Sequence, residues 1–166
     1  MNRPIIFLDW DGVLRFGEND WTTDAMVQLN LLCLETGAAI VLTTSCRYEQ
    51  SLKKLVATMR KNGLDKAIAV LGETRDLDTY RAAAKRKDLI FQVGFERWSK
   101  GKEIEAWLEA QPEVERFVVI DDHPEFCTPY EERTVVPVGP LSSQDRWLAL
   151  ELLENQREQQ KHKMTI

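Results

Sequence analysis

Five short apolar runs punctuate the chain, and segments with helical spacing separate most of them. The apolar runs are residues 5–8, 38–42, 67–71, 116–120 and 134–138. Apolar residues recur at helical spacing over residues 24–36, 48–62 and 102–110. Short apolar runs are typical of buried strands, and strands that alternate with helices favour right-handed crossovers and a parallel sheet. The pattern therefore predicts an α/β domain with a mostly parallel central sheet.

Turn and capping residues mark the ends of several predicted elements. Gly37 and Gly63 follow the first two helical segments, where glycine commonly ends a helix. Ser142 and Asp145 have the spacing of a capping box and open the last helix. Residues 13–22 mix glycine, acids and aromatics, which indicates a loop or a small hairpin.

Composition limits the class of protein. The chain has 166 residues, 43% apolar and 30% charged, so we expect one domain over residues 1–166 with a polar tail from about residue 156. The net charge of −5 argues against binding of nucleic acid or an anionic membrane over the whole surface. No apolar run approaches the about 20 residues that span a bilayer, and the N-terminus does not resemble a signal peptide. Three widely spaced cysteines indicate neither a disulfide framework nor a zinc cluster, and they favour a cytoplasmic location.

Three of the predicted strands stop abruptly at acids or hydroxyls. Asp9 and Asp11 follow the first strand, Thr44 and Ser45 the second, and Asp121 and Asp122 the fourth. Ligands bind at the carboxyl ends of the strands in parallel sheets of this type. We therefore expect these side chains to share one site.

The acids suggest phosphoryl chemistry. Asp9 and Asp11 are two residues apart, a spacing that can aim both carboxylates into one crevice. Carboxylates this close repel each other unless a cation is present, and Mg²⁺ prefers oxygen ligands. Asp121 and Asp122 would supply the remaining acidic ligand. One carboxylate could then attack phosphorus, while its partner protonates the leaving oxygen and later activates water.

A phosphoryl group also needs neutral and cationic donors. Thr44 or Ser45 offers a hydroxyl, and Lys100 or Lys102 lies at the start of a helix, where the helix dipole favours an anion. Each feature also has a plainer explanation: D-x-D-G segments form turns, hydroxyls end strands, lysines lie on solvated helix faces and paired acids cap helices. The ordered placement of all four features favours a site.

These four segments, in this order, resemble the motifs of the haloacid dehalogenase-like (HAD) superfamily. The segment DWDGV at residues 9–13 resembles the first motif, D-x-D-G-[VT]. Residues 40–45, Lys100 or Lys102, and residues 118–122 resemble the second, third and fourth motifs. The resemblance covers about residues 5–150 and implies a three-layer Rossmann-like fold.

A closer similarity is to small HAD domains related to the phosphatase domains of RNA-repair (polynucleotide) proteins. The segment TSCR at residues 44–47 resembles their T/S-S-x-R segment. The segment GKEIEAWL at residues 101–108 resembles a helix with the pattern G-x-E-I-x-x-W-L. Residues 136–141 resemble a late V-x-x-G-L-type segment.

The resemblance implies a catalytic role for both acids of the first motif. Asp9 would form an aspartyl-phosphate and contribute to the Mg²⁺ site. Asp11 would be the general acid and base, and its backbone carbonyl would help to bind Mg²⁺.

The other motifs would bind the phosphoryl group and the metal. Alignment through Arg47 favours Ser45 as the phosphate-binding hydroxyl, while the T-S pattern of deoxynucleotidases favours Thr44. Lys100, or its rival Lys102, would neutralise charge. Asp121 would ligate Mg²⁺ directly or through water, and Asp122 would assist.

Spacing bears on the substrate as well. Between Asp11 and Thr44 there is room for only a loop and one helix, so we expect a capless domain or one with a small lid. Capless relatives often take extended substrates, so nucleic-acid 3′-phosphate ends and nucleotides are the first candidates. A small metabolite or a phosphoprotein is the alternative. A receiver-like phospho-acceptor is less favoured because the lysine precedes the last acid pair. A non-catalytic binding module is also less favoured, because every motif position is occupied.

Several residues could contact a nucleic acid. Residues 81–87, with four positive charges and no negative one, could bind its backbone. Trp10, Trp21 and Trp98 could stack on bases. Arg47 could bind a second phosphate. The plainer explanations are a solvated helix face for the basic stretch, packing for the tryptophans and an ion pair for Arg47.

Overall fold

The computed structural model describes residues 3–17, 19–75, 77 and 99–164. In this part of the chain, parallel strands form one five-stranded sheet with the order β3-β2-β1-β4-β5. The strands are β1 (Ile5–Leu8), β2 (Ala39–Leu42), β3 (Val70–Glu73), β4 (Phe117–Ile120) and β5 (Thr134–Val135). The predicted α/β fold with a parallel central sheet is confirmed.

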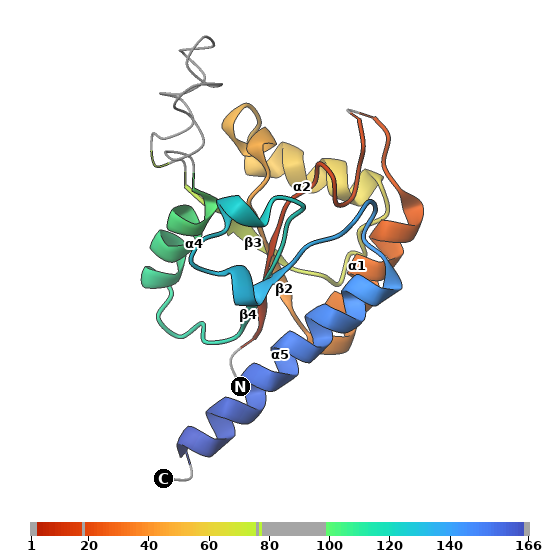
Figure 1. Ribbon diagram of the computed structural model, residues 1–166. Coiled ribbons are helices and arrows are strands. Elements are labelled where there is room, and N and C mark those ends of the chain that lie inside the picture. Colours follow the sequence, from red (N-terminus) through yellow and green to blue (C-terminus); the bar gives the residue numbers. More distant parts are fainter. Residues whose placement is uncertain (1–2, 18, 76, 78–98, 165–166) are drawn as a thin grey trace.

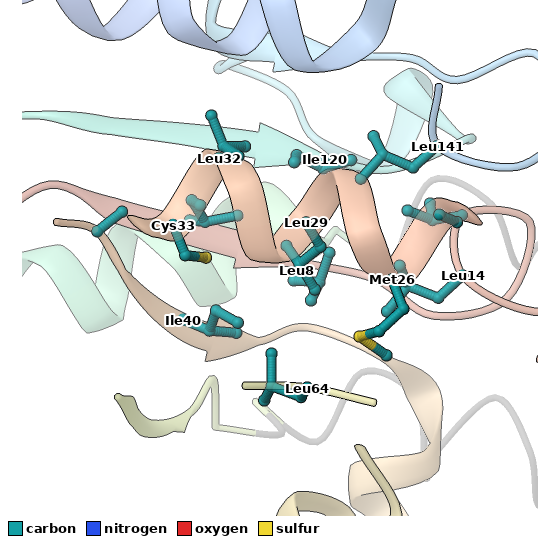
Figure 2. Packing of buried hydrophobic residues seen from close by; sticks show 14 of the residues in the cluster. Leu8, Leu14, Met26, Leu29, Leu32, Cys33, Ile40, Leu64, Ile120 and Leu141 are labelled. Carbon is teal, nitrogen blue, oxygen red and sulfur yellow. The ribbon is translucent and has the colours of Figure 1, made fainter. Parts of the chain in front are cut away.

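Helices cover both faces of the sheet and make three layers (Figure 1). One face packs against α1 (Thr23–Thr36), α2 (Leu52–Lys61) and α5 (Ser143–Met164), and the other against α4 (Lys100–Glu109). Figure 2 shows Leu29 and Leu32 of α1 lying over Leu8 and Ile120 in the larger core. None of the described helices has the length and apolar character needed to cross a membrane.

The register of the central strands places their carboxyl ends at one level. Leu8 pairs with Leu42 of β2 and with Ile120 of β4. The hydrogen bonds continue one residue further, because the Thr43 N–H donates to the Leu8 carbonyl at 2.9 Å and the Asp9 N–H to the Ile120 carbonyl at 3.0 Å. Residues 9, 43 and 121 therefore lie side by side at the edge of the sheet.

Side-chain alternation gives these three positions a common direction. Leu8 lies in the core under α1, and Phe7 lies in the smaller core with Ile104 of α4. Because successive residues of a strand point to opposite faces, the residue after Leu8 points toward the α4 side. The same alternation applies at the ends of β2 and β4, whose registers match β1.

Two helices begin at residues other than those the spacing indicates. The predicted helix 48–62 begins at Leu52, because Ser51 caps it and a 3₁₀ turn, η1 (Ser45–Tyr48), precedes the cap. The helix predicted from residue 102 begins at Lys100, because the Ser99 hydroxyl accepts the Lys102 N–H at 3.2 Å.

Two strands also differ from the prediction. The strand predicted at 67–71 begins at Val70, because Asp65 forms a turn in which its side chain accepts the Ala67 N–H at 2.8 Å. The strand predicted at 134–138 ends at Val135, and Pro137, which has no N–H, cannot extend the ladder.

The C-terminal segment is part of the fold and not only a polar tail. The capping box at Ser142 and Asp145 is confirmed by reciprocal hydrogen bonds, and α5 continues to Met164. The Gln156 amide accepts the Phe117 N–H at 3.0 Å and donates to the Phe117 carbonyl at 2.9 Å. This pair of hydrogen bonds attaches α5 to the start of β4.

Candidate active site

Lys100 lies between two strand-end carboxylates. Its Nζ is 2.6 Å from Asp9 Oδ2 and 2.5 Å from Asp121 Oδ2. Only 1% of Lys100 is exposed, and both aspartates are buried. Asp9 and Asp121 follow the paired strands β1 and β4. Lys100 is the first residue of α4 and reaches the same edge of the sheet from the helical layer that α4 forms.

Backbone amides fix the other oxygen of each carboxylate. Asp9 Oδ1 accepts the Trp10 N–H at 2.8 Å, and Asp121 Oδ1 accepts the His123 N–H at 2.9 Å. Both carboxylates are thus held by one ammonium and one amide each. Such fixed geometry favours a site organised before a ligand arrives.

The site carries more negative charge than Lys100 balances. Burial alone would lower the pKa of Lys100, but Asp9 and Asp121 outweigh it and raise that pKa, so the ammonium stays charged. Burial raises the pKa of Asp121 to about 6, and Asp9 adds to this rise although Lys100 opposes it. Two buried carboxylates share one ammonium, so a further cation would relieve the excess charge.

The acids around this edge fit a hard divalent ion. Asp9, Asp121 and Asp122 each offer an oxygen, and these oxygens lie within 4.8 Å of one another. Asp122 Oδ1 is buried and has no hydrogen-bond partner among the described residues. A buried carboxylate oxygen without a partner is costly unless a cation binds it. An all-oxygen donor set is the type that Mg²⁺ prefers.

Gly12 allows the first motif to approach this acidic cluster. Its φ of 77° is in the left-handed region, and a Cβ at this position would lie 2.1 Å from Asp122 Oδ2. Any larger residue would displace the Asp122 carboxylate. The glycine of the first motif is therefore required both by the turn and by the close approach.

The side chain of Asp11 is not one of the three clustered acids. Its carboxylate is paired with Arg15, with Nε to Oδ1 at 2.7 Å and Nη2 to Oδ2 at 3.1 Å. The Asp11 side chain is 51% exposed, whereas that of Arg15 is only 10% exposed. The role of Arg15 could not be predicted from the sequence, because the pair depends on a bridge between residues 11 and 15 within a tight turn.

Three hydroxyl groups follow β2, those of Thr43, Thr44 and Ser45. Thr43 is level with Asp9, and its Oγ1 is buried without a hydrogen-bond partner among the described residues. Thr44, one of the two hydroxyls between which the sequence left the choice open, uses its Oγ1 to accept the Cys46 N–H at 3.4 Å as the cap of η1. Ser45 lies one residue further along and is half-buried.

Arg47 has a structural role in place of the expected contact with substrate. Its guanidinium pairs with Glu103 of α4 and donates to the carbonyls of Thr43, Thr44 and Thr74. The paired side chains are 1% and 0% exposed, so the guanidinium is not open to a second phosphate. Arg47 instead ties the ends of β2 and β3 to the helix that carries Lys100.

The remaining candidates from the sequence are Lys102, the tryptophans and the basic stretch. Lys102 is exposed, unlike the buried Lys100. Trp10 is 1% exposed and packs edge-on against Trp21 with ring centroids 5.1 Å apart, so it lies in the core and cannot stack on a base. The basic stretch 81–87 and Trp98 lie outside the described residues.

A parallel sheet with acids at the ends of adjacent central strands and a buried lysine between them defines an α/β domain of the HAD type. A family model for the HAD domain in Swiss Army Knife RNA repair proteins matches residues 5–140, and the chain belongs to this family. Membership places the protein among hydrolases of phosphatase type. Comparison with curated proteins and with solved structures gave no match.

Proposed function

We propose that the protein is a Mg²⁺-dependent phosphatase that hydrolyses phosphomonoesters through an aspartyl-phosphate on Asp9. The observation that carries this proposal is Lys100 held between Asp9 and Asp121, beside an Asp122 oxygen that has no hydrogen-bond partner among the described residues. Lys100 neutralises phosphoryl charge in this scheme. Asp9, Asp121 and Asp122 hold the ion, with the Asp11 carbonyl as a further candidate ligand.

The proposed reaction has two steps. A carboxylate oxygen of Asp9 attacks phosphorus as the bond from phosphorus to the ester oxygen breaks, and Asp11 gives that oxygen a proton. Water then attacks phosphorus, gives a proton to Asp11 and releases phosphate from Asp9. Thr43 donates its hydroxyl to a phosphoryl oxygen, with Thr44 and Ser45 as the alternatives. The bound ion would shield the charge of the carboxylates and of the phosphoryl oxygens.

Nucleic-acid 3′-phosphate ends or nucleotides are the proposed substrates, in the cytoplasm. Membership of a family of RNA-repair HAD domains supports a phosphorylated nucleic acid. The three cysteines are free, which supports a reducing compartment. A phosphorylated small metabolite or a phosphoprotein is the alternative substrate.

Phosphate release from a panel of substrates tests both the proposed mechanism and the proposed class of substrate. We expect release from 3′-phosphorylated oligonucleotides with Mg²⁺, none with a chelator, and near-complete loss in Asp9→Asn. Mononucleotides, sugar phosphates and a phosphopeptide complete the panel. Turnover of sugar phosphates alone would overturn the nucleic-acid substrate, and unchanged turnover in Asp9→Asn would overturn the mechanism.

A further inference from the structure

Asp11 and Arg15 form an ion pair in the turn that follows β1. Arg15 binds both oxygens of the Asp11 carboxylate, at 2.7 and 3.1 Å. An ionised carboxylate has about four acceptor positions, so a two-point contact leaves one free on each oxygen. The Asp11 carboxyl group is half-exposed, so one of these positions is open to carry the proton that Asp11 gives to the leaving oxygen and takes back from water.

Arg15 is itself held firmly. Its guanidinium carbon lies 5.5 Å from the ring centroid of Trp10 and 5.7 Å from that of Trp21. Its Nη2 also donates to Cys46 Sγ at 2.9 Å, which links the turn after β1 to η1 after β2. The two tryptophan rings and the contact with η1 thus fix the guanidinium of Arg15, which in turn holds the exposed carboxylate of Asp11.

The turn that carries both residues is also tight. The Trp10 carbonyl accepts the N–H groups of residues 13, 14 and 15 at 3.2, 2.8 and 3.1 Å, and the Gly12 N–H donates to the Arg15 carbonyl at 3.0 Å. Asp11 is therefore fixed through its backbone and, by way of Arg15, through its side chain. A residue that must give and then take one proton gains from such control of its orientation.

We infer that Arg15 is a positioning residue that orients Asp11 for proton transfer to the leaving oxygen. The inference rests on the proposed function, in which Asp11 protonates the ester oxygen while Asp9 forms a bond to phosphorus. Without the two-point contact, an exposed aspartate would sample several rotamers, and only some would reach the leaving oxygen. Arg15 contacts Asp11 and does not react itself.

The test uses two substrates that differ in their need for a proton. An alkyl phosphate, such as a nucleoside 3′-phosphate, has a leaving oxygen that needs protonation, whereas 4-nitrophenyl phosphate leaves as a stable anion. The quantity is kcat/KM, because it reports the step that breaks the ester bond. General acid catalysis contributes about 10²- to 10⁴-fold, so we expect Arg15→Met to lose about 10- to 100-fold with the alkyl phosphate and less than about threefold with the aryl one.

Matched variants separate positioning from a structural effect. Arg15→Lys keeps the positive charge but loses the two-point contact of the guanidinium. Its kcat/KM with the alkyl phosphate should therefore lie between those of wild type and Arg15→Met. Arg146→Met removes a similarly buried arginine, 11% exposed and paired with Glu35, and should leave both rates unchanged. Asp11→Asn should show the same selective loss, and Arg15→Met should add little to it.

Each outcome decides the inference. Equal losses with both substrates, or full additivity with Asp11→Asn, would show that Arg15 does not act through Asp11. Thermal unfolding of each variant shows whether it still folds. If Arg15→Met does not fold, the losses of kcat/KM in Arg15→Lys with the two substrates decide the inference. If wild type and Asp9→Asn release equally little phosphate from both substrates, the proposed function fails and this inference falls with it.

Discussion

Replacement of Arg47 by methionine should destabilise the protein far more than a surface substitution would. Methionine keeps much of the apolar stem but removes the cation from Glu103 and the donors from three carbonyls. Both members of the ion pair are almost wholly buried, so the carboxylate of Glu103 would remain without its counter-charge. Loss of one partner of a buried pair costs about 3–5 kcal/mol.

That loss would be a large share of the total stability. Folded domains have free energies of unfolding of about 5–15 kcal/mol. For a chain of this length each kcal/mol corresponds to about 2–4 °C, so the melting temperature should fall on the order of 10 °C. Tyr48 and Thr74 still donate to Glu103, so part of its hydrogen bonding survives.

Urea unfolding at neutral pH measures the change, and Arg157→Met is the matched control. Arg157 pairs with Glu154 on the exposed surface of α5, and such a pair is worth at most about 1 kcal/mol. Glu103→Gln is the second comparison, because its amide still accepts hydrogen bonds. An Arg47→Met variant as stable as wild type, with only a raised KM, would refute the structural role and restore Arg47 as a substrate contact.

Three further predictions follow from the site. Gly12→Ala should weaken Mg²⁺ binding about 10- to 100-fold, because its Cβ displaces Asp122; equal affinity by calorimetry would contradict this. Thr43→Val should raise KM about tenfold and leave stability nearly unchanged, since it removes a hydroxyl that has no partner in the described part of the chain. Thr44→Val should instead lose a cap worth about 1 kcal/mol, and the opposite pattern would return the role to Thr44. Burial raises the pKa of the Glu103 carboxyl, so its contribution to stability is fully present below its ordinary pKa and is lost as pH rises through the raised value. The stability of Glu103→Gln relative to wild type should therefore increase with pH, and a difference that is flat with pH would contradict this.

The general architecture could be predicted from the sequence because it depends on local pattern. Short apolar runs predicted the strands, and the acids and hydroxyls at the ends of three of them predicted the edge of the sheet where the site lies. Gly37 and the pair Ser142 and Asp145 marked helix ends through their own backbone chemistry. Strand boundaries shifted where one residue decided them, through a side-chain turn at Asp65 and through the missing N–H of Pro137.

The position of the lysine was open in the sequence although helix periodicity bears on it. Lys100, Glu103 and Ile104 are spaced by three and four residues, and all are buried on one side of α4. Lys102 falls on the other side and is exposed. Lys100 lies one turn before Ile104 on the same buried side of the helix, so helix periodicity favours Lys100 over Lys102 as the site lysine.

The partners in the ion pairs could not be predicted, since each pair depends on tertiary contacts. Arg47 and Glu103 are 56 residues apart, and no spacing rule connects them. Asp11 and Arg15 are four residues apart, as on a helix face, but they meet across a bridge in a turn. The sequence therefore left Arg47 open between a second phosphate and an ion pair, and the structure shows the ion pair, with Glu103.

The hydroxyl that we propose binds the phosphate was not identified from the sequence, because it depends on strand register, which the sequence does not state directly. Asp9, Thr43 and Asp121 are each the first residue after a four-residue strand, and the three strands pair level with one another. Pleating turns first residues of level strands to the same face, here the face covered by the helix of Lys100. The second residue after each strand does not share that direction. The rule that places Asp9 beside Asp121 therefore also selects Thr43 over Thr44.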